Sequence, residues 1–427
     1  EMRQGLALVG RQAGGALDSL RDLVARSRLD LPEGLPPMSA GVFGAIGYDM
    51  IRLVERLPNI NPDPLDLPDG LMIRPSMVAI FDAIAQEIIL VTTVRPSEIT
   101  AKAAYEDAQA RLAEVAADLR NPAPALTGAA QPEPDRFTTP VSREDYHRIV
   151  ARAKDYILAG DIFQVVPSHR FRAPFAHDPF ALYRSLRRMN PSPFLFYMNF
   201  GDFQLAGSSP EILVRLRDGK ITIRPIAGTR PRGATPEEDR ALEADLLADP
   251  KERAEHLMLL DLGRNDVGRV AEIGSVRVTD QFVIERYSHV MHIVSNVIGR
   301  LAAPNDTVDA LMAGFPAGTV SGAPKVRAME VIDELEKSKR GPYAGCVGYF
   351  AADGEMDTCI VLRTALVKDG RVYVQAGAGV VYDSIPENEQ QECINKAKAV
   401  VRAAEEAVRF ASRGAARKTS GNGGAWS

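Results

Sequence analysis

The chain has 427 residues, of which 45% are hydrophobic and 25% charged, and its formal net charge is −5. A nucleic-acid-binding protein would carry a basic excess, which this chain lacks. No apolar run approaches the ~18 residues that indicate a membrane span. The three cysteines have no CxxC spacing and are too few for a disulfide framework. We therefore expect a globular, cytoplasmic protein with no nucleic-acid or membrane partner.

Proline content marks a boundary within the chain. Residues 121–140 contain five prolines among glycine, alanine and polar residues, and proline removes backbone donors and fixes φ, so regular secondary structure is not expected there. We interpret this stretch as a linker between an N-terminal region, 1–120, and a larger domain, 141–411. The beginning of the chain has no signal-peptide pattern, and we expect the N-terminal region to be truncated. The basic, Gly/Ser-rich residues 412–427 predict a disordered tail.

Hydrophobic periodicity predicts the main elements in chain order. Upstream of the linker we expect strands at Val78–Phe81 and Glu87–Thr92 and an amphipathic helix at Ile99–Leu119. Downstream, Ser142 suits a helix start, and the helical pattern continues to Ala159. The strands expected after it are Gln164–Arg172, Phe194–Phe200, Gln204–Gly207, Ile212–Leu216, Ile221–Ile223, Val276–Val278, Val347–Ala351, Thr358–Leu366 and Val372–Ala376. Because helices separate groups of strands rather than following each one, an α+β fold with packed antiparallel sheets is favoured over a doubly wound parallel sheet.

Two acidic helix starts stand out as candidate chemistry. Glu252 and Glu255 follow Asp249-Pro250, and Glu389 and Glu392 follow Pro386 with the same three-residue spacing, which places each pair on one helix face. The alternative is structural, because acidic residues near a helix N-terminus are favoured by the macrodipole. If the two helices meet, their four carboxylates need a counter-charge, and a hard cation such as Mg²⁺ suits oxygen ligands.

Other motifs leave their alternatives open. The turn Gly318–Lys325 departs from the phosphate-loop pattern because proline precedes its lysine, although it leads into a helix expected at Lys325–Leu335 and its backbone N–H groups could hold an anion. Glycines 377 and 379 allow close approach to a ligand or form a tight turn. Cys346 lacks the glycine spacing of a nucleophile elbow and is expected in the core. His289 and His292, three residues apart, suit metal ligation, acid–base chemistry or burial in the core.

Six strings in a fixed order carry a resemblance to a known family. They are PIAGT (225–229), RAEHLMLLDLGRNDVGRV (253–270), YSHVMH (287–292), FPAGTVSGAPK (315–325), IVLRTA (360–365) and QAGAGVVYDS (375–384). Together they resemble the chorismate-using enzymes, and most of all the anthranilate synthase component I subunits, across about residues 141–411. Gly41–Pro58 is similar to the N-terminal part of the same subunits.

The resemblance implies two packed antiparallel sheets wrapped by helices, and it implies a chorismate-binding catalytic domain at 141–411. It also implies a lyase of tryptophan biosynthesis that uses chorismate, Mg²⁺ and ammonia from a separate glutaminase subunit. Glu255 and Glu392 resemble the direct Mg²⁺ ligands, with Glu252 and Glu389 behind them. The implied substrate-binding residues are Gly228, Thr229, Thr319, Tyr343, Arg363, Gly377, Gly379 and Lys396. The implied catalytic residues are Glu211, which would protonate the departing 4-hydroxyl, His292 near the reacting ring, and Gln164.

Two positions distinguish sister activities within this resemblance. Ala227 stands where aminodeoxychorismate synthases often have a lysine nucleophile, so ammonia must attack the ring directly. Gln164 stands where isochorismate and salicylate synthases have a lysine that activates water, and an amide cannot take up a proton at neutral pH. Both positions favour anthranilate synthase. The alternatives are a 2-amino-2-deoxyisochorismate or aminodeoxychorismate-type synthase and, outside catalysis, a tryptophan-sensing subunit with a degenerate site.

A feedback site for tryptophan is also implied, through half of its pattern. Pro193, Phe194 and Leu195 resemble one side of the family's inhibitor pocket, whereas the LLES-like motif of the other side is not visible. The alternative is a turn that enters a strand, which the prolines at 191 and 193 explain without a ligand.

Overall fold

The computed structural model describes residues 1–4, 7–10, 14–95, 99–122, 137–287 and 290–420. Backbone contacts divide the chain into two compact units. The first unit comprises residues 1–44, 72–125 and 348–357, and the second comprises 45–71, 126–347 and 358–427. Most of the proline-rich stretch lies outside the described residues, so its role as a linker stays a prediction.

The first unit contains short hairpins and two helices. β1 (Met2–Gln4) pairs with β2 (Ala7–Gly10), and β5 (Met77–Asp82) pairs with β6 (Glu87–Thr92), all antiparallel. α1 (Ala16–Ala25) and α2 (Ala101–Asp118) are its helices, and most of β3 (Gly41–Ile46) and β17 (Cys346–Ala351) belongs to it as neighbouring strands. The strands and the helix that the sequence predicted at 78–119 are thus confirmed within one or two residues.

A five-stranded antiparallel sheet forms one layer of the second unit. Its strand order is β8 (Ser168–Pro174), β20 (Arg371–Gly377), β19 (Thr364–Lys368), β10 (Phe203–Ser209) and β9 (Phe194–Asn199). Two distant parts of the chain meet in this sheet, because Ser168 at the start of β8 pairs with Gly377 at the end of β20. The sheet therefore brings together residues that are about two hundred positions apart.

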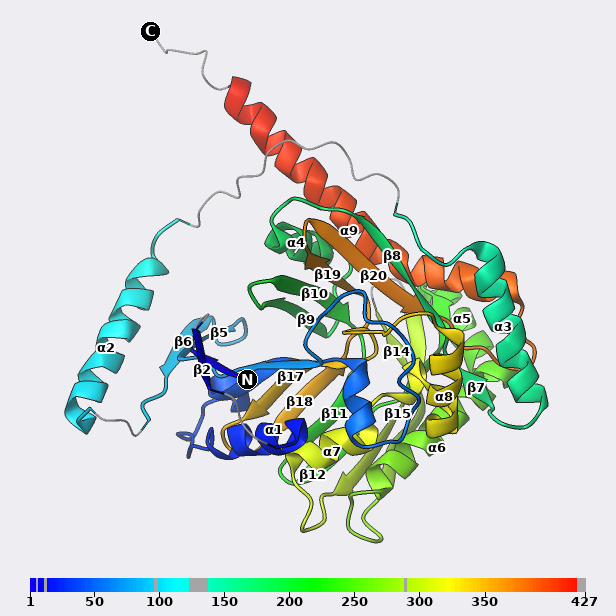
Figure 1. Cartoon of the computed structure of the whole chain (residues 1–427), viewed down its shortest axis with the longest axis horizontal. Helices are drawn as coiled ribbons and strands as arrows, with labels where there is room; N and C mark the ends of the chain where they lie inside the picture. The colour runs from blue at the N-terminus through cyan, green and yellow to red at the C-terminus, as the bar shows by residue number, and fades with distance from the viewer. Residues whose placement is uncertain (5–6, 11–13, 96–98, 123–136, 288–289, 421–427) are drawn as a thin grey trace. The chain divides into compact units, whose positions relative to one another are not determined.

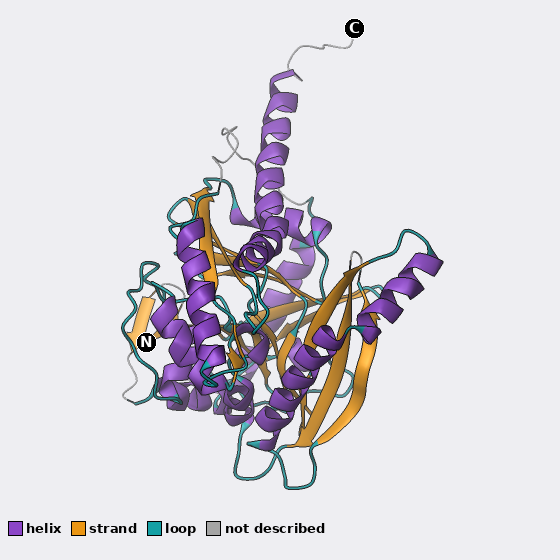
Figure 2. Cartoon of the chain, turned by 90° about the vertical axis from the view of Figure 1, so that its right-hand side faces the viewer, coloured by secondary structure: helices purple, strands orange, loops and turns teal. Residues whose placement is uncertain are grey.

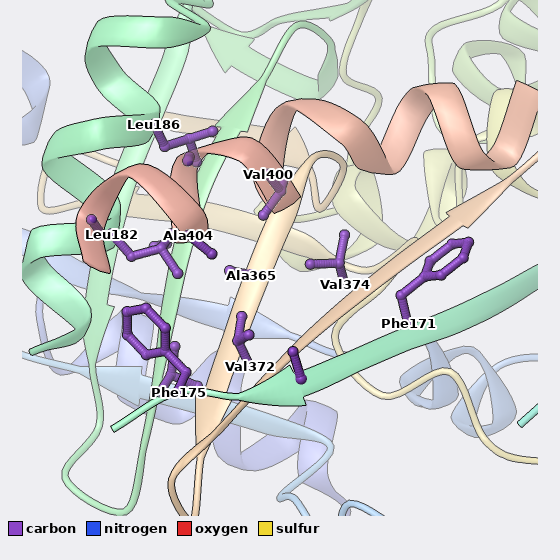
Figure 3. Close-up of a cluster of buried hydrophobic side chains, with 14 of the residues drawn as sticks. Phe171, Phe175, Leu182, Leu186, Ala365, Val372, Val374, Val400 and Ala404 are labelled. Carbon is purple, nitrogen blue, oxygen red and sulfur yellow. The ribbon is translucent and has the colours of Figure 1, made fainter. Parts of the chain in front are cut away.

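Two helices cover one face of this sheet. α4 (Pro179–Met189) and α9 (Pro386–Ser420) pack on each other and on the strands. Their apolar faces share a buried cluster in which Leu182 and Leu186 of α4 and Val400 and Ala404 of α9 point toward Val374 of β20 (Figure 3). Each buried aliphatic side chain of this kind contributes about 1.5 to 3 kcal/mol. The first turns of α9 are therefore held in place by a core that its later turns build.

A second antiparallel sheet carries most of the remaining strands of this unit. Its order is β13 (Ile226–Pro231), β15 (Val290–Arg300), β12 (Lys220–Ile223), β11 (Ile212–Arg217) and β18 (Met356–Ile360), and β14 (Arg277–Arg286) also pairs with β15. Apolar residues of both sheets, including Leu205, Leu366 and Cys359, meet in one buried cluster. The fold is α+β with packed antiparallel sheets, as predicted.

Helices flank the strands of the second sheet (Figure 2). α6 (Pro250–Gly268) packs on β13 and β15, α7 (Thr307–Gly314) packs on β11, and α5 (Pro236–Ala248) packs on β13. The other elements are α3 (Arg143–Leu158), α8 (Lys325–Leu335), the short pair β7 (Gln164–Val165) and β16 (Gly322–Ala323), β4 (Gly70–Ile73), and the 3₁₀ turns η1 (Pro37–Ser39), η2 (Tyr48–Leu53) and η3 (Gly318–Val320). None of the described helices is long and apolar enough to cross a membrane.

Several element boundaries differ from the sequence prediction. The strand expected over Thr358–Leu366 is interrupted, because Arg363 adopts a left-handed φ of 48° between β18 and β19. The strand expected over Gln164–Arg172 divides into β7 and β8 on either side of Pro167. β15 was not predicted, since its apolar residues occur in adjacent pairs separated by polar residues and show no strict alternation. α9 continues to Ser420, eight residues past the start of the expected tail, and 421–427 lie outside the described residues.

Candidate active site

The first acidic helix start lies on α6 (Figure 1). The Asp249 side chain accepts from the backbone N–H groups of Lys251 (2.9 Å) and Glu252 (3.3 Å) and so begins the helix. Glu255, one turn on, accepts a hydrogen bond of 3.0 Å from Nε2 of Gln164 on β7. Burial raises the pKa of Glu255, and the neighbouring charges of Glu252 and Glu392 raise that pKa further. This mutual repulsion shows that carboxylates of α6 and α9 lie close together.

The second acidic helix start lies on α9 and includes a lysine. Glu392 forms an ion pair of 2.7 Å with Lys396 one turn later, and Nζ of Lys396 also donates to the backbone oxygen of Gly377 at 3.1 Å. Glu389 is buried and hydrogen-bonded to Ser384, and burial raises its pKa. The end of β20 is thereby joined to the acidic face of α9.

The carboxylates are near one another but are held by other partners. Glu252 pairs with Arg230 at 3.2 Å and Glu392 pairs with Lys396. Among the described residues, no group of three or more His, Cys, Asp or Glu side chains is gathered closely enough to hold a metal ion. The donor set nevertheless fits a hard cation, because it offers only oxygens and the buried Oε1 of Gln164 has no hydrogen-bond partner.

Glu211 is a buried acid between β10 and β11. Both of its carboxylate oxygens are within hydrogen-bond distance of the Thr319 hydroxyl, at 3.2 and 3.3 Å. Burial raises the pKa of Glu211 to about 8, although Thr319 and the charge of Arg363 lower it. At neutral pH this side chain therefore holds a proton that it can donate.

His292 is held as a neutral imidazole. Its Nδ1 lies 2.9 Å from the backbone oxygen of Gly228 and 3.1 Å from Oγ1 of Thr229. Because a carbonyl oxygen only accepts, Nδ1 carries the proton and Nε2 is left as an acceptor. Burial lowers the pKa of His292, and the Tyr287 ring packs edge-on against it at 5.5 Å between centroids.

Arg363 supplies a partly buried cation near Glu211. Its left-handed φ of 48° is costly for a side chain of this size. Burial lowers the pKa of Arg363, and the nearest acidic charge that opposes this effect is Glu211. No ion pair joins Arg363 to a carboxylate within the part of the chain that the structure describes. A partly buried guanidinium without a counter-ion is suited to bind a carboxylate of a ligand.

Two glycines leave room at the centre of the site. A Cβ on Gly377 would lie 2.9 Å from the Tyr343 hydroxyl, which accepts the N–H of that glycine. A Cβ on Gly379 would lie 2.6 Å from Nε2 of Gln164 and 3.7 Å from Glu255. Neither glycine has a left-handed φ. Protein groups lie close to both glycines, and their close approach to a ligand stays a prediction.

The candidate inhibitor residues lie at an edge strand. Phe194 and Leu195 begin β9 and pair with Ser209 and Ser208 of β10, and Pro193 directly precedes them. The Phe194 side chain packs on the cluster shared by the two sheets. The alternative of a turn entering a strand describes this local structure, and the inhibitor role stays a prediction.

Two motifs considered at the sequence level have structural explanations. Nζ of Lys325 forms a buried ion pair of 2.8 Å with Asp266, so the lysine of the glycine-rich turn is already neutralised. Cys346 is buried and burial raises the pKa of its thiol far above the usual range, which makes the thiol unreactive. His289 lies outside the described residues.

Two arginines that organise the site were not recognised from the sequence. Arg230 pairs with Asp245, Asp249 and Glu252 and so fixes the start of α6. Arg340 is fully buried and pairs with Glu336. Nothing in the spacing of either residue distinguishes it from a solvent-exposed arginine: the partners of Arg230 are distant in sequence, and the four-residue spacing of Glu336 and Arg340 is equally typical of an exposed helix pair.

Comparison with known proteins identifies the family of the chain. The family model for chorismate binding enzymes matches residues 9–402. Anthranilate synthase component 1 of Cereibacter sphaeroides is 61% identical over 94% of this chain and 80% of its own length. The protein of the same name from Thermus thermophilus is 48% identical over 95% and 86%.

Solved structures give the same result. Anthranilate synthase component I from Streptococcus pneumoniae has a TM-score of 0.82 and 43% identity, covering 91% of this chain and 86% of that one. The menaquinone-specific isochorismate synthase of Escherichia coli, at 24% identity and a TM-score of 0.71, shares the fold. The chain therefore belongs to the chorismate binding enzyme family, among its anthranilate synthase component 1 members.

Proposed function

We propose that this chain is the large subunit of an anthranilate synthase, a lyase that converts chorismate and ammonia into anthranilate, pyruvate and water. The observation that carries the proposal is Gln164, whose amide is bonded to Glu255 at the position where water-using relatives were expected to have a lysine. An amide supplies no base, and ammonia needs none, because its neutral form is already a nucleophile. Ala227 on β13 likewise offers no nucleophile of its own.

In the first chemical step, ammonia forms a bond to C2 of the ring while the bond from C4 to its hydroxyl breaks. Glu211, held protonated by burial, donates its proton to that hydroxyl, which leaves as water. Arg363 and Lys396 supply positive charge for the substrate carboxylates. Tyr343, Gly228, Thr229, Thr319, Gly377 and Gly379 are the other residues to which we assign contacts with the substrate.

In the second step, the ring loses its C2 proton and the enolpyruvyl group, and aromaticity is restored. We assign Nε2 of His292 as the base that accepts the C2 proton, because Nδ1 already donates its proton to the Gly228 oxygen. Protonation of the departing enolpyruvate gives pyruvate. A synthase that stops before this step would release 2-amino-2-deoxyisochorismate instead.

Mg²⁺ is the cofactor we propose, held by Glu255 and Glu392 with Glu252 and Glu389 behind them. When bound, it would neutralise a substrate carboxylate and the repulsion that raises the pKa of Glu255. Lys396 would keep its bond to the Gly377 oxygen and turn its remaining donors to the substrate.

The proposal extends to partners and location. The name component 1 of the relatives supports a second subunit, which we take to be a glutaminase that delivers ammonia. Tryptophan is the proposed feedback inhibitor, at Pro193, Phe194 and Leu195. The three cysteines are free and buried, which suits the reducing cytoplasm. Residues 121–140 would link the N-terminal region to the catalytic segment 141–411.

Incubation of the purified chain with chorismate, Mg²⁺ and ammonium at alkaline pH tests the proposal. Anthranilate fluorescence and equimolar pyruvate are expected. Accumulation of a non-aromatic amino acid from chorismate would instead identify a synthase of the alternative type. Tryptophan binding without turnover would identify a sensing subunit.

A further inference from the structure

Arg340 is the most completely buried charged side chain around the site, with 1% of its surface exposed. It follows α8, and its guanidinium forms a forked ion pair with Glu336: Nε lies 3.0 Å from Oε2 and Nη2 lies 2.6 Å from Oε1. The guanidinium also lies over the rings of Tyr48 and Tyr343, at 4.8 and 5.5 Å from their centroids. The cation is therefore enclosed by one carboxylate and two aromatic faces.

The remaining donors of Arg340 bind two backbone segments. Nη1 donates to the oxygen of Val320 and Nη2 donates to the oxygen of Val166, each at 2.7 Å. Val320 directly follows Thr319, the residue that bonds Glu211. Val166 lies two residues after Gln164, the residue that bonds Glu255. One planar group thus joins the segments that carry both of these contacts.

The carboxylate of the pair binds a third segment. Oε1 of Glu336 accepts from both the backbone N–H and the hydroxyl of Ser168, each at 2.8 Å. Ser168 is the partner of Gly377 in the β8–β20 register. The Arg340–Glu336 pair therefore meets three segments: two of them carry Thr319 and Gln164 of the proposed site, and the third pairs with the strand that carries Gly377.

Burial of such a pair is a poor way to gain stability alone. Removing two charges from water costs several kcal/mol per ion, and well-packed apolar residues often serve equally well. What apolar residues cannot do is present donors to two carbonyl oxygens in a fixed plane. Lysine cannot do so either, because its ammonium is a point charge without the fork of a guanidinium.

We propose that Arg340 is a positioning residue of the amination site, which holds Thr319 against Glu211 and Gln164 against Glu255 through the carbonyl oxygens of Val320 and Val166. The inference rests on the proposed function for its kinetic consequences. It concerns the placement of two segments, and that placement is measurable without turnover.

Arg52 provides a matched control within the same unit. Its guanidinium is also largely buried, at 14% exposed, and is forked on Asp333 with two contacts of 2.7 Å and bonded to Asp49 at 2.8 Å. None of its partners carries a residue of the proposed site. Arg340→Lys and Arg52→Lys therefore remove equivalent forks, and Glu336→Gln serves as a second variant of the pair if Arg340→Lys does not fold.

The expected kinetic result for Arg340→Lys is a loss of kcat on the order of 100-fold, as misplacement by about an ångström can produce, with the KM for chorismate nearly unchanged. In the pH–rate profile, with the rate expressed per free ammonia, the pKa at which activity falls at high pH should rise. The reason is that the Thr319 hydroxyl lowers the pKa of Glu211, so displacement of Thr319 raises this pKa. The charges of Arg363 and Lys396, which also lower the pKa of Glu211, stay in place. Tyr287 is the other titratable group near Glu211. Arg52→Lys should lose thermal stability without either change.

Hydrogen–deuterium exchange measures the same placement directly. In Arg340→Lys, peptides that cover 163–168 and 318–323 should exchange faster than in the wild type and in Arg52→Lys. If Arg340→Lys and Arg52→Lys behave alike in exchange and in the pH profile, the positioning role is contradicted and the pair is purely structural. A wild-type chain that makes no anthranilate contradicts the proposed function, and the exchange comparison then decides the inference alone.

Discussion

The Thr319 hydroxyl lies within hydrogen-bond distance of both carboxylate oxygens of Glu211 and is the strongest of the groups that favour the ionised form of this buried acid. Burial acts in the opposite direction and dominates, so that the pKa of Glu211 is about 8. The balance between these two effects sets the pH range in which the acid can donate. Two measurable consequences follow for catalysis and for stability.

Thr319→Val should raise the pKa of Glu211, because the carboxylate loses its donor. A hydrogen bond to a charged group contributes about 1.5 to 3 kcal/mol and one pKa unit corresponds to about 1.4 kcal/mol, so we expect the pKa of Glu211 to rise by about one to two units. The measurement is the pH dependence of kcat, expressed per free ammonia, which gives the pKa at which activity falls at high pH. Thr358→Val is the control, since the Thr358 hydroxyl is also buried but donates to the Val214 oxygen at 2.8 Å. An unchanged pKa in Thr319→Val would contradict the assignment.

The same acid should make stability pH-dependent. Between the ordinary pKa of 4.5 and the folded value of about 8, the folded chain keeps a proton on Glu211 that the unfolded chain has released. The contribution of Glu211 to the free energy of unfolding therefore falls as pH rises through this window and is constant above it. Glu211→Gln should remove this slope, which denaturant titrations at several pH values can measure. An identical slope in the variant would show that another group is responsible.

Glu255→Gln and Glu392→Gln should each reduce turnover by more than about 100-fold at ordinary Mg²⁺. Mutation of groups that only hydrogen-bond a metal ligand already costs about 10- to 100-fold in activity or metal affinity, and a direct ligand should cost more. A Mg²⁺ titration of the rate separates weakened metal binding from slower chemistry. Glu387→Gln is the matched control on the first turn of α9, where Glu387 pairs with Arg143 at the surface. Full wild-type activity in excess chelator would exclude a metal role.

Gln164→Lys should change the products formed from chorismate. A lysine at this position can pair with Glu255 and, in its neutral form, activate water, so that some hydroxylated product accompanies anthranilate. Chromatography of the products measures the ratio. Gln164→Met, which removes the amide without adding a base, should be slower but should form no hydroxylated product. Normal rate and unchanged products in Gln164→Lys would contradict the role of this position.

Ammonium salts alone should support the reaction, whereas glutamine should require a separate glutaminase subunit. The physical reason is that Cys346 is buried with a strongly raised pKa and so cannot act as a glutaminase nucleophile. Raising the pH should speed the ammonium reaction up to the pKa of Glu211, because the neutral amine is the nucleophile. Anthranilate made from glutamine by the purified chain alone would overturn this prediction.

Local signals in the sequence predicted the elements that local interactions decide. Ser142 begins α3 because its hydroxyl accepts the N–H of Asp145, and the spacing of Glu252 and Glu255 places both on one face of α6. The short apolar runs at 78–81 and 87–92 predicted the strands β5 and β6. The family motifs then indicated which of the many glycines and carboxylates belong to one site, a conclusion that spacing alone does not reach.

Contacts between distant segments could not be predicted from the sequence. That Arg230 holds Glu252, and that Arg340 reaches the carbonyl oxygens of Val166 and Val320, depends on where three turns meet. β15 was missed because successive residues on both of its faces are buried, so its sequence lacks the apolar–polar alternation of a half-exposed strand. The left-handed φ of Arg363, which divides the strand expected there, has no signature in residue type.

The pairing of β8 with β20 determines when the site can form during synthesis. Ser168 leaves the ribosome about two hundred residues before its partner Gly377, and the turns of α9 that cover the sheet follow later still. Until then β8 has an unpaired edge and apolar residues without cover, which is a state exposed to aggregation. Chaperone dependence in the cell, and slow refolding set by this long-range closure, are the biological cost of building one site from both ends of a long segment.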